Sequence, residues 1–378
     1  MRILINCSTL KKGGVLQVGH SFVSELLNRS DHDYYFIIST ELRKFFGEND
    51  VGKKDNFFIY DVKPSVFLSL TGKEKSLNSI MEQINPDAVF TVFGPTYWKP
   101  ACLHVSGFAK PSYIYTDSPF IERMPVMAKL KLAILKRLHL YDFKNFNNAL
   151  VTETADASDR LKGILPSKTV YTVSNTYNQV YDQPGLWDRS IDLPDFDGIT
   201  LLSITANYLH KNLGIIPGVI SYLNDKYPSF KFRFVLTLNS EDFNHLDDNQ
   251  RKHIIFLGRV SIYQCPKLYM ESDFMFMPTL LECFTATYPE AMKMKVPILT
   301  SDLSFARDIC DDAAVFFNPV SAGDIAEKIY SLAGNKELQA KLTERGEERL
   351  KTFNSSGSRA DKYIKILEKL YETNNSKP

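Results

Sequence analysis

The sequence predicts an α/β protein with two open, doubly wound parallel sheets, one in each half of the chain, that face each other across a cleft. Short apolar runs alternate with helical stretches in the first half, a polar segment interrupts them, and the same rhythm then restarts. The chain has 378 residues, of which 44% are hydrophobic, and this length is sufficient for two cores. Because such sheets bind ligands at the carboxyl ends of their strands, we expect a site in the cleft.

Six apolar runs are the expected strands of the first sheet: 3–7, 34–38, 57–60, 88–93, 113–115 and 149–151. Gly13 and Gly14 follow the first run and precede a helix expected over 16–27. Glycine lets the backbone approach a bulky anion closely, so the pair could face a diphosphate. An ordinary tight turn explains the same two residues equally well.

The segment 181–198 is polar and contains two prolines and two glycines, which predicts a linker. The first domain would then cover 1–180 and the second 199–355, with a C-terminal helix and tail over 356–378 that could pack back on the first domain. The second sheet would use the runs 200–204, 232–236, 254–256, 274–277, 297–299 and 314–316.

Charge and cysteine content exclude several classes of protein. Lys and Arg total 45 against 44 Asp and Glu, so nothing in the overall charge indicates nucleic acid as a partner. The five cysteines show neither Cys-x-x-Cys nor zinc spacing, which favours a reducing compartment and no metal. Residues 1–7 are too short an apolar run for a signal peptide, and no run is long enough to span a bilayer. We therefore expect a cytoplasmic protein whose membrane contact, if any, is peripheral.

Two glutamates, Glu282 and Glu290, follow the apolar run 274–277, which Pro278 ends. Pro289 suits the first turn of a helix that contains Glu290. The first N–H groups of a helix can bind an anion, whereas carboxylates beside them suit hydroxyl groups. This combination predicts a nucleotide diphosphate sugar as ligand. The alternative is that the glutamates only complement the helix dipole.

Lys211 and Asp117 are the other candidate catalytic residues. Lys211 directly follows the first strand of the second domain. It could reach the same phosphate across the switch point, the position where the strand order reverses, in place of a metal ion. It could also be a solvated surface charge. Asp117 is expected at the end of a first-domain strand, where it could orient or deprotonate an acceptor hydroxyl, or simply cap the turn before Pro119.

The segment 121–146 interleaves six basic residues with apolar ones and contains only two acidic residues. A basic amphipathic helix can rest on an anionic bilayer, with its apolar side chains in the interface and its lysines at the headgroups. A helix that packs on the core and exposes a basic face would have the same periodicity.

With these residues placed, the chain resembles glycosyltransferase family 4, retaining sugar transferases with the GT-B double-Rossmann fold. The resemblance is strongest within 200–329, in the pair Lys211-Asn212 and in the segments 255–258, 282–292 and 296–298. The first domain matches more loosely, through Gly13-Gly14 and the segments 86–89 and 149–152. It implies that Glu290 holds the ribose hydroxyls, that Glu282 touches the donor sugar, and that Lys211 holds the diphosphate. The backbone amides of Phe284, Thr285, Ala286 and Thr287 would assist Lys211, and Gly258, Arg259 and Val260 would border the base.

Three positions depart from the pattern of the family. Asn207 stands where the family often has an arginine beside the phosphates, Thr285 replaces a glycine, and Thr116-Asp117 replaces a His-Asp pair. The resemblance implies a metal-independent, retaining transfer from a nucleotide diphosphate sugar, with UDP favoured over GDP and no cofactor. The expected acceptor is a glycan, such as a lipid-linked saccharide of bacterial surface polysaccharide synthesis. A nucleotide-sugar epimerase and a non-catalytic nucleotide-sugar-binding subunit of a transferase complex are the alternatives.

Overall fold

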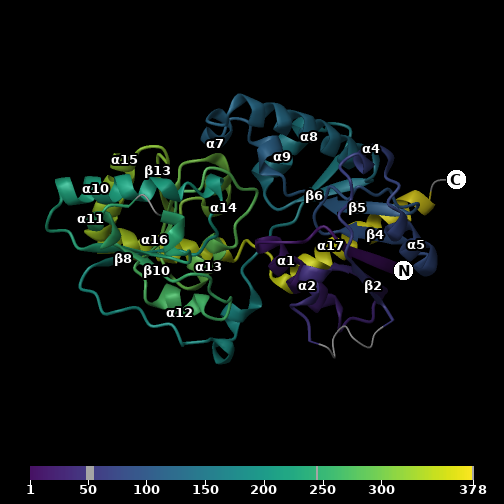
Figure 1. Cartoon of the computed structure of the whole chain (residues 1–378). Helices are drawn as coiled ribbons and strands as arrows, with labels where there is room; N and C mark the ends of the chain where they lie inside the picture. Colours follow the sequence, from purple (N-terminus) through teal and green to yellow (C-terminus); the bar gives the residue numbers. More distant parts are fainter. Residues whose placement is uncertain (48–54, 244–245, 377–378) are drawn as a thin grey trace. The chain divides into compact units, whose positions relative to one another are not determined.

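The computed structural model describes residues 1–47, 55–243 and 246–376 (Figure 1). Contacts divide the chain into two compact units. Unit 1 comprises Met1–Thr116, Met124–Asn175 and Asn354–Pro378, and unit 2 comprises Asp117–Arg123 and Thr176–Phe353. Residues 176–180, which the sequence analysis assigned to the first domain, therefore belong to unit 2.

Unit 1 contains a seven-stranded parallel sheet in the order β3-β2-β1-β4-β5-β6-β7. Its strands are β1 (Arg2–Cys7), β2 (Asp33–Ser39), β3 (Phe57–Tyr60), β4 (Ala88–Thr91), β5 (Leu103–Gly107), β6 (Ala149–Thr152) and β7 (Thr169–Thr172). The order reverses between β1 and β4, as expected for a doubly wound sheet.

The strand predicted over 113–115 is wrong, because this stretch lies in a short helix, α6 (Pro111–Ile114), and the residue that ends it. Pro111 occupies the first turn of α6, where its fixed φ favours a helix and its missing N–H costs nothing. The strands β5 and β7 were not predicted from the sequence. β5 carries His104 and Ser106 among its apolar residues, so it lacks a continuous apolar run, although both of its faces are buried.

The helices of unit 1 are α1 (Gly14–Leu26), α2 (Thr40–Arg43), α4 (Leu68–Thr71), α5 (Lys75–Ile84), α6, α8 (Val126–Asn145), α9 (Ala155–Ile164) and α17 (Ser356–Asn375). α17, yellow in Figure 1, packs beside α1. Its Tyr363 ring lies 5.2 Å from that of Phe22 in α1 and 4.6 Å from that of Phe90 in β4. The last helix of the chain therefore completes the core of unit 1, together with Leu367, which is fully buried.

Unit 2 contains a six-stranded parallel sheet in the order β10-β9-β8-β11-β12-β13. Its strands are β8 (Ile199–Ser203), β9 (Phe232–Leu236), β10 (Ile254–Phe256), β11 (Phe274–Met277), β12 (Ile298–Ser301) and β13 (Ala314–Phe317). These strands confirm the six runs predicted for the second sheet. All four residues of β11 are buried, since helices cover both faces of the sheet. β11 pairs with β8 in the register Phe274↔Leu201, and the strand order reverses between these two strands.

The helices of unit 2 are α7 (Pro119–Glu122), α10 (Ile216–Lys226), α11 (Asp248–Arg251), α12 (Cys265–Met270), α13 (Thr287–Lys293), α14 (Ser304–Cys310), α15 (Ala322–Ala333) and α16 (Lys336–Leu350). Among the described residues of unit 2, short 3₁₀ turns accompany them: η1 (Gln179–Asp182), η2 (Pro184–Leu186), η3 (Leu209–Lys211), η4 (Leu213–Ile215) and η5 (Ser240–Phe243). η1 and η2 fall at and within the segment predicted as a linker.

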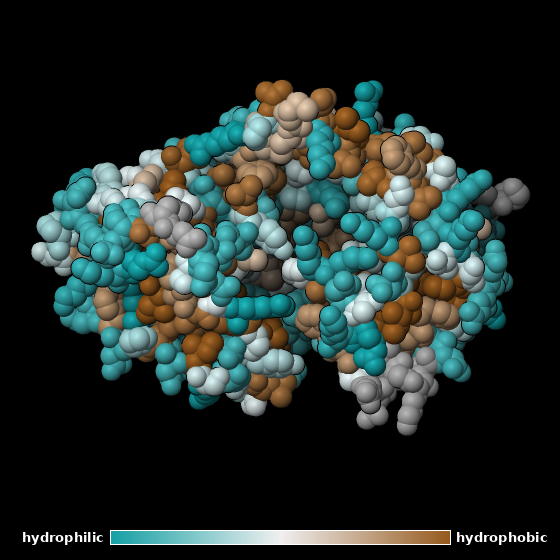
Figure 2. Space-filling model, in the orientation of Figure 1, coloured by the Kyte–Doolittle hydropathy of each residue, from teal (hydrophilic) through white to brown (hydrophobic). Residues whose placement is uncertain are grey.

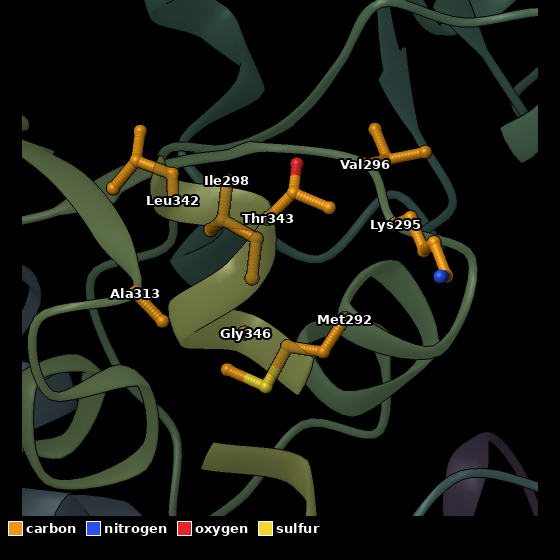
Figure 3. A pocket seen from close by; sticks show the side chains of 8 residues that line it. All are labelled: Met292, Lys295, Val296, Ile298, Ala313, Leu342, Thr343 and Gly346. Carbon is orange, nitrogen blue, oxygen red and sulfur yellow. The ribbon is translucent and has the colours of Figure 1, made fainter. Parts of the chain in front are cut away.

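A small, mainly apolar hollow lies between α13, β12 and α16 (Figure 3). Met292, Ile298 and Leu342 are among the residues that line it. Gly346 lets α16 approach α13 closely, since a Cβ at this position would lie 3.3 Å from Cγ of Met292. Neither Glu282 nor Lys211 lines this hollow, so it is separate from the candidate site.

Because Leu367 is fully buried where α17 closes the core of unit 1, we expect Leu367→Ala to lower the free energy of unfolding of unit 1 by about 2–5 kcal/mol. The chain has two tryptophans, Trp98 in unit 1 and Trp187 in unit 2. In a Trp187→Phe background, urea unfolding followed by tryptophan fluorescence therefore reports on unit 1. Lys369→Ala, at an exposed position of the same helix, is the control. Equal midpoints for the two variants would contradict the packing role of α17.

Candidate functional site

The candidate site lies at the carboxyl ends of β8 and β11, where the strand order of unit 2 reverses. The loops that follow these two strands are joined by hydrogen bonds. The backbone carbonyl of His210 accepts a bond from the N–H of Leu280 at 2.7 Å and one from the hydroxyl of Thr279 at 3.2 Å. The predicted residues on the two loops are thereby held at one place on the sheet edge.

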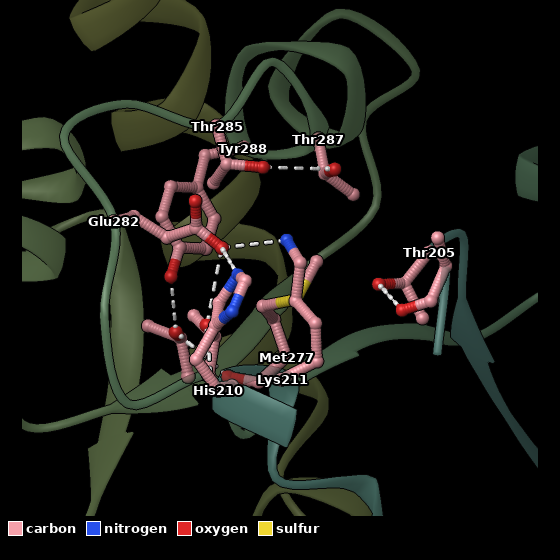
Figure 4. Close-up of polar contacts among 11 residues, drawn as sticks. Thr205, His210, Lys211, Met277, Glu282, Thr285, Thr287 and Tyr288 are labelled. Atoms are coloured by element: carbon pink, nitrogen blue, oxygen red, sulfur yellow. Dashed lines mark hydrogen bonds and ion pairs between the residues drawn. The ribbon is translucent and has the colours of Figure 1, made fainter. Parts of the chain in front are cut away.

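An ion pair joins two of the predicted catalytic residues. Nζ of Lys211 lies 2.6 Å from Oε1 of Glu282, and only 12% and 13% of the two side chains are exposed. The hydroxyl of Thr279 lies 3.1 Å from the same oxygen, so its single proton is shared between Glu282 and the His210 carbonyl. Nε2 of His210 lies 3.8 Å from it, and Figure 4 shows the His210 and Lys211 side chains both reaching toward Glu282. Each charge compensates the other, so removing either residue alone leaves a poorly solvated charge.

The backbone after β8 explains how Lys211 reaches this position. η3 ends at Lys211, and Asn212 after it adopts the left-handed conformation with φ 56°. Asparagine tolerates this conformation better than most residues. Its side-chain amide donates to the carbonyl of Pro319 at 2.7 Å, which fixes the turn. The Lys-Asn pair is therefore a structural unit, in which Asn212 turns the chain and Lys211 carries the charge.

Aromatic side chains flank the ion pair. The rings of Tyr208 and His210 are stacked at 5.5 Å with 8° between their planes. The ring of Phe120, from the segment Asp117–Arg123 that belongs to unit 2, meets His210 edge-on at 6.0 Å. Sequence reasoning did not identify these three residues, because single aromatic residues in loops carry no recognisable spacing.

Asp117 does not follow a strand, as the sequence analysis expected, but a turn after α6. The hydroxyl of Ser118, the next residue, is buried and donates to the carbonyl of Leu280 at 2.6 Å. Asp117 itself is exposed. The hydrogen bond of Ser118 therefore holds Asp117 beside the loop that carries Glu282.

Glu290 lies in the first turn of α13 and is only 6% exposed. The hydroxyl of Tyr269 donates to its Oε2 at 3.4 Å. Burial raises the pKa of Glu290 to about 7, and the hydroxyls of Tyr181 and Tyr269 partly offset this by stabilising the carboxylate. Tyr181 belongs to η1, so part of the segment predicted as a linker or domain end covers this glutamate. Neither tyrosine was identified from the sequence.

The loop between the two glutamates contains the four predicted amide donors. Ala286 is the N-cap of α13 and has no side-chain oxygen that could occupy the first N–H groups of the helix. The hydroxyls of Thr285 and Thr287 are 3.2 Å apart, and both residues are buried. Phe284 packs edge-on against Phe353 at 6.1 Å. These contacts fix the path of the loop at the position where the family has a glycine.

The residues expected near the base and the phosphates lie in neighbouring loops of unit 2. Gly258 has φ 69°, and its N–H donates to the carbonyl of Leu238 at 2.9 Å. Arg259 after it is exposed, and Val260 is half-buried. The side-chain amide of Asn207 donates to Asp242 at 2.9 Å. Asn207 is therefore bound to a carboxylate and brings no positive charge to the position of the family arginine.

Gly13 and Gly14 lie in unit 1 at the start of α1. Gly13 is the N-cap and has φ 76° and ψ −161°, a conformation that is accessible mainly to glycine. A Cβ at Gly14 would meet no atom within 4 Å. Within the ranges that the structure describes, no group of three or more His, Cys, Asp or Glu side chains could hold a metal ion.

The raised pKa of Glu290 gives its stability contribution a defined pH dependence. This contribution is fully present below about pH 4.5, the ordinary pKa, and is lost as the pH rises through about 7. We therefore expect the difference in free energy of unfolding between Glu290→Gln and wild type to shift in favour of the variant as the pH rises from 5.5 to 8. The shift should be on the order of 1–3 kcal/mol in urea unfolding.

The matched control for Glu290→Gln is Glu327→Gln. Hydrogen bonds, chiefly from Lys226, lower the pKa of Glu327 to about 2, so the stability of this variant relative to wild type should not change between the two pH values. A pH-independent difference for Glu290→Gln as well would show that Glu290 is not protonated near neutral pH.

Comparison with known proteins concerns the fold and the sequence pattern of residues 240–349. Residues 240–349, which include both glutamates, match the sequence model described as Glycosyl transferases group 1. No curated protein matches the chain significantly. Similar solved structures include a glycosyltransferase from Rickettsia africae, with a TM-score of 0.71 and 16% identity over 100% of this chain and 99% of that chain.

Two further similar structures contain uridine nucleotides. Anabaena HepE in complex with UDP has a TM-score of 0.68 and 12% identity over 98% of this chain and 100% of that chain. UDP-GlcNAc 2-epimerase from Neisseria meningitidis, bound to UDP-GlcNAc, has a TM-score of 0.59 and 15% identity over 98% and 100%. The chain therefore has the GT-B fold of two Rossmann-like domains, and residues 240–349 have the sequence pattern of group 1 glycosyl transferases.

Proposed function

We propose that this protein is a retaining glycosyltransferase that moves a sugar from a nucleotide diphosphate sugar to a glycan acceptor. The observation that carries the proposal is the enclosed Lys211–Glu282 ion pair at the switch point of unit 2, whose residues 240–349 match the group 1 sequence model. A cation and a carboxylate fixed together at the edge of a parallel sheet suit a ligand that presents phosphate and hydroxyl groups side by side.

In the proposed reaction, the bond between the anomeric carbon and the diphosphate breaks while the acceptor hydroxyl forms a new bond on the same face of the sugar. Lys211 and the amides of 284–287 stabilise the negative charge that develops on the diphosphate. Glu282 accepts hydrogen bonds from the donor sugar and Glu290 from the ribose. The departing phosphate oxygen takes the proton of the acceptor hydroxyl, which Asp117 orients.

The ribose role of Glu290 requires its carboxyl group to exchange tyrosine hydroxyls for ribose hydroxyls. Tyr269 lies in α12, whereas Tyr181 lies in η1, a short turn. A shift of Tyr181 would open Glu290 without disturbing the sheet. UDP is the favoured carrier, and the UDP bound by the similar Anabaena structure supports this choice.

The fold similarity extends to an epimerase, so reaction assays must separate the two activities. The group 1 sequence match favours transfer. An epimer formed from the donor alone, without an acceptor, would instead establish an epimerase. Donor binding without transfer, hydrolysis or epimerisation would establish the non-catalytic subunit.

Loss of the Lys211 charge should impair the chemical step. We expect Lys211→Met to lower kcat/KM by at least about tenfold, because a preorganised donor at a developing oxyanion typically contributes about a hundred- to a thousandfold in rate. The double variant Lys211→Met/Glu282→Gln removes the unpaired carboxylate and should recover stability but not activity. Lys226→Met, at an exposed lysine of unit 2, is the control. Turnover by Lys211→Met near the wild-type rate would exclude this role.

We further propose that the acceptor is a lipid-linked saccharide and that α8 contacts the anionic membrane that carries it. Along the described parts of the chain, no helix combines the length and the hydropathy needed to cross a bilayer. α8 nevertheless exposes large apolar side chains, and Figure 2 shows hydrophobic residues at the surface in its region. These exposed side chains are Val126, Met127, Leu130, Ile134 and Tyr141.

The spacing of these residues puts them on one side of α8, since Leu130, Ile134 and Tyr141 follow Val126 and Met127 at intervals of three, four or seven residues. Lys129 and Lys131 are exposed on either side of this stripe, and Arg137, three residues after Ile134, is an exposed basic residue within it. The buried residues of the helix, His139, Asp142 and Phe143, all lie in its last two turns. The first turns therefore do not pack in a core, whereas an apolar stripe flanked by basic residues complements an anionic lipid surface.

The last turns of α8 fix the helix to unit 1 through polar contacts. The carboxylate of Asp142 accepts a hydrogen bond from the N–H of Tyr97 at 2.8 Å. The ring nitrogens of His139 lie 2.7 Å from the hydroxyl of Tyr113 and 3.1 Å from that of Tyr97. These contacts leave Val126, Met127, Leu130 and Ile134 exposed toward the other end of the helix.

Membrane contact through α8 predicts co-sedimentation with vesicles that contain anionic lipid, with weaker binding at high salt. Leu130→Ser/Ile134→Ser should reduce the bound fraction at least about fivefold, because it removes apolar area from the interface. Leu186→Ser, at an exposed leucine of unit 2, should not. If the double variant binds vesicles normally but alters the sedimentation coefficient of the protein alone, the stripe joins two copies of the chain instead.

A further inference from the structure

His210 lies next to the proposed donor site, and the mechanism above gives it no role. Its Nε2 is 3.8 Å from the Glu282 oxygen to which Lys211 is paired, and 29% of its side chain is exposed. Its ring is held between Tyr208 and Phe120, and its backbone carbonyl is bonded to the loop of Glu282. The imidazole is therefore fixed just beyond hydrogen-bonding distance of that carboxylate.

Donor binding makes opposing demands on Lys211. The ammonium group neutralises Glu282, which is 13% exposed, in the free protein. The same group is the proposed partner of a diphosphate that carries two negative charges. If Lys211 turns to the diphosphate, Glu282 loses its cation in a poorly hydrated place, which is costly. Asn207 cannot help, because it is neutral and bonded to Asp242.

We propose that His210 becomes the charge partner of Glu282 when Lys211 turns to the diphosphate, and that it takes up a proton as the donor binds. A small movement of the ring brings Nε2–H within hydrogen-bonding distance of Oε1 of Glu282. The exposed edge of His210 gives the proton a route from solvent. His210 is thus a positioning residue that keeps Glu282 paired and Lys211 available. The inference rests on the proposed function.

The charges that face His210 agree with this exchange. In the free protein, burial lowers the pKa of His210, Glu282 raises it and Lys211 lowers it further. The segment 117–123 also packs against His210, and it contacts the imidazole through the uncharged ring of Phe120. When Lys211 moves toward the diphosphate, its repulsion of a protonated imidazole weakens while the attraction of Glu282 remains. The loss of this repulsion favours the imidazolium.

Calorimetry tests the proton uptake directly. Binding of UDP-glucose, UDP-N-acetylglucosamine and GDP-mannose is measured at pH 7.5 in buffers of different ionisation enthalpy, which gives the number of protons exchanged. These donors carry diphosphate diesters that do not titrate near neutral pH. For each donor molecule bound, we expect wild type to take up more protons than His210→Phe, with a difference of at most about one proton. The variant keeps an aromatic ring but cannot be protonated.

Glu290 also exchanges protons near neutral pH, because its pKa is raised to about 7. It does so equally in wild type and in His210→Phe, so the difference between the two isolates His210. Equal proton counts with intact binding would overturn the inference and leave the proposed function standing. If none of the nucleotide sugars binds, the proposed function fails and the inference falls with it.

A second measurement needs no donor. Lys211→Met imitates the departure of the ammonium group, so the proton affinity of His210 should rise by about tenfold in an NMR titration of the histidine ring protons. The signal of His210 is assigned by its loss in His210→Phe. In Lys211→Met/Glu282→Gln the rise should disappear, because the attracting carboxylate is gone. An unchanged pKa in Lys211→Met would also overturn the inference.

Discussion

The enclosed ion pair between Lys211 and Glu282 is the interaction on which the candidate site depends. It joins the loops after β8 and β11 at the point where the strand order of unit 2 reverses. Two opposite charges can be buried there because the Thr279 hydroxyl is within hydrogen-bonding distance of the shared oxygen, and because the bond from the Leu280 N–H to the His210 carbonyl ties the loops together. Without these bonds, the cost of taking both charges out of water would outweigh their attraction.

Sequence reasoning located the strands of unit 2 well, because a parallel strand buried on both faces appears as a short continuous apolar run. The same rule failed for β5, where His104 and Ser106 interrupt the run. The structure shows how one of these polar residues is accommodated. The ring nitrogens of the buried His104 lie 2.6 Å from the carbonyl of Phe146 and 2.9 Å from the hydroxyl of Thr91. Such tertiary partners leave no trace in local periodicity.

At the candidate site, too, sequence reasoning found some residues and missed the partners that surround them. Glu282 and Lys211 could be selected from their positions after strands, but their pairing depends on how two distant loops cross. Tyr181 was hidden in a segment whose prolines and glycines indicated a linker, and Tyr269 in a short, mostly buried helix. Both enclose Glu290. A residue chosen for its chemistry can therefore be found from sequence, whereas the neighbours that set its protonation come from folding.

The attachment of α8 at one end has a mechanical consequence. Its buried residues lie near Phe143, whereas the exposed apolar residues begin at Val126, so Val126 lies at the end of a lever arm of about 25 Å at the rise of an α-helix. A slight rotation about the fixed end therefore moves Val126 much farther than it moves the residues near Phe143. The direction in which the exposed stripe points is set by Tyr97, Tyr113 and their partners, side chains that need never touch whatever the stripe binds.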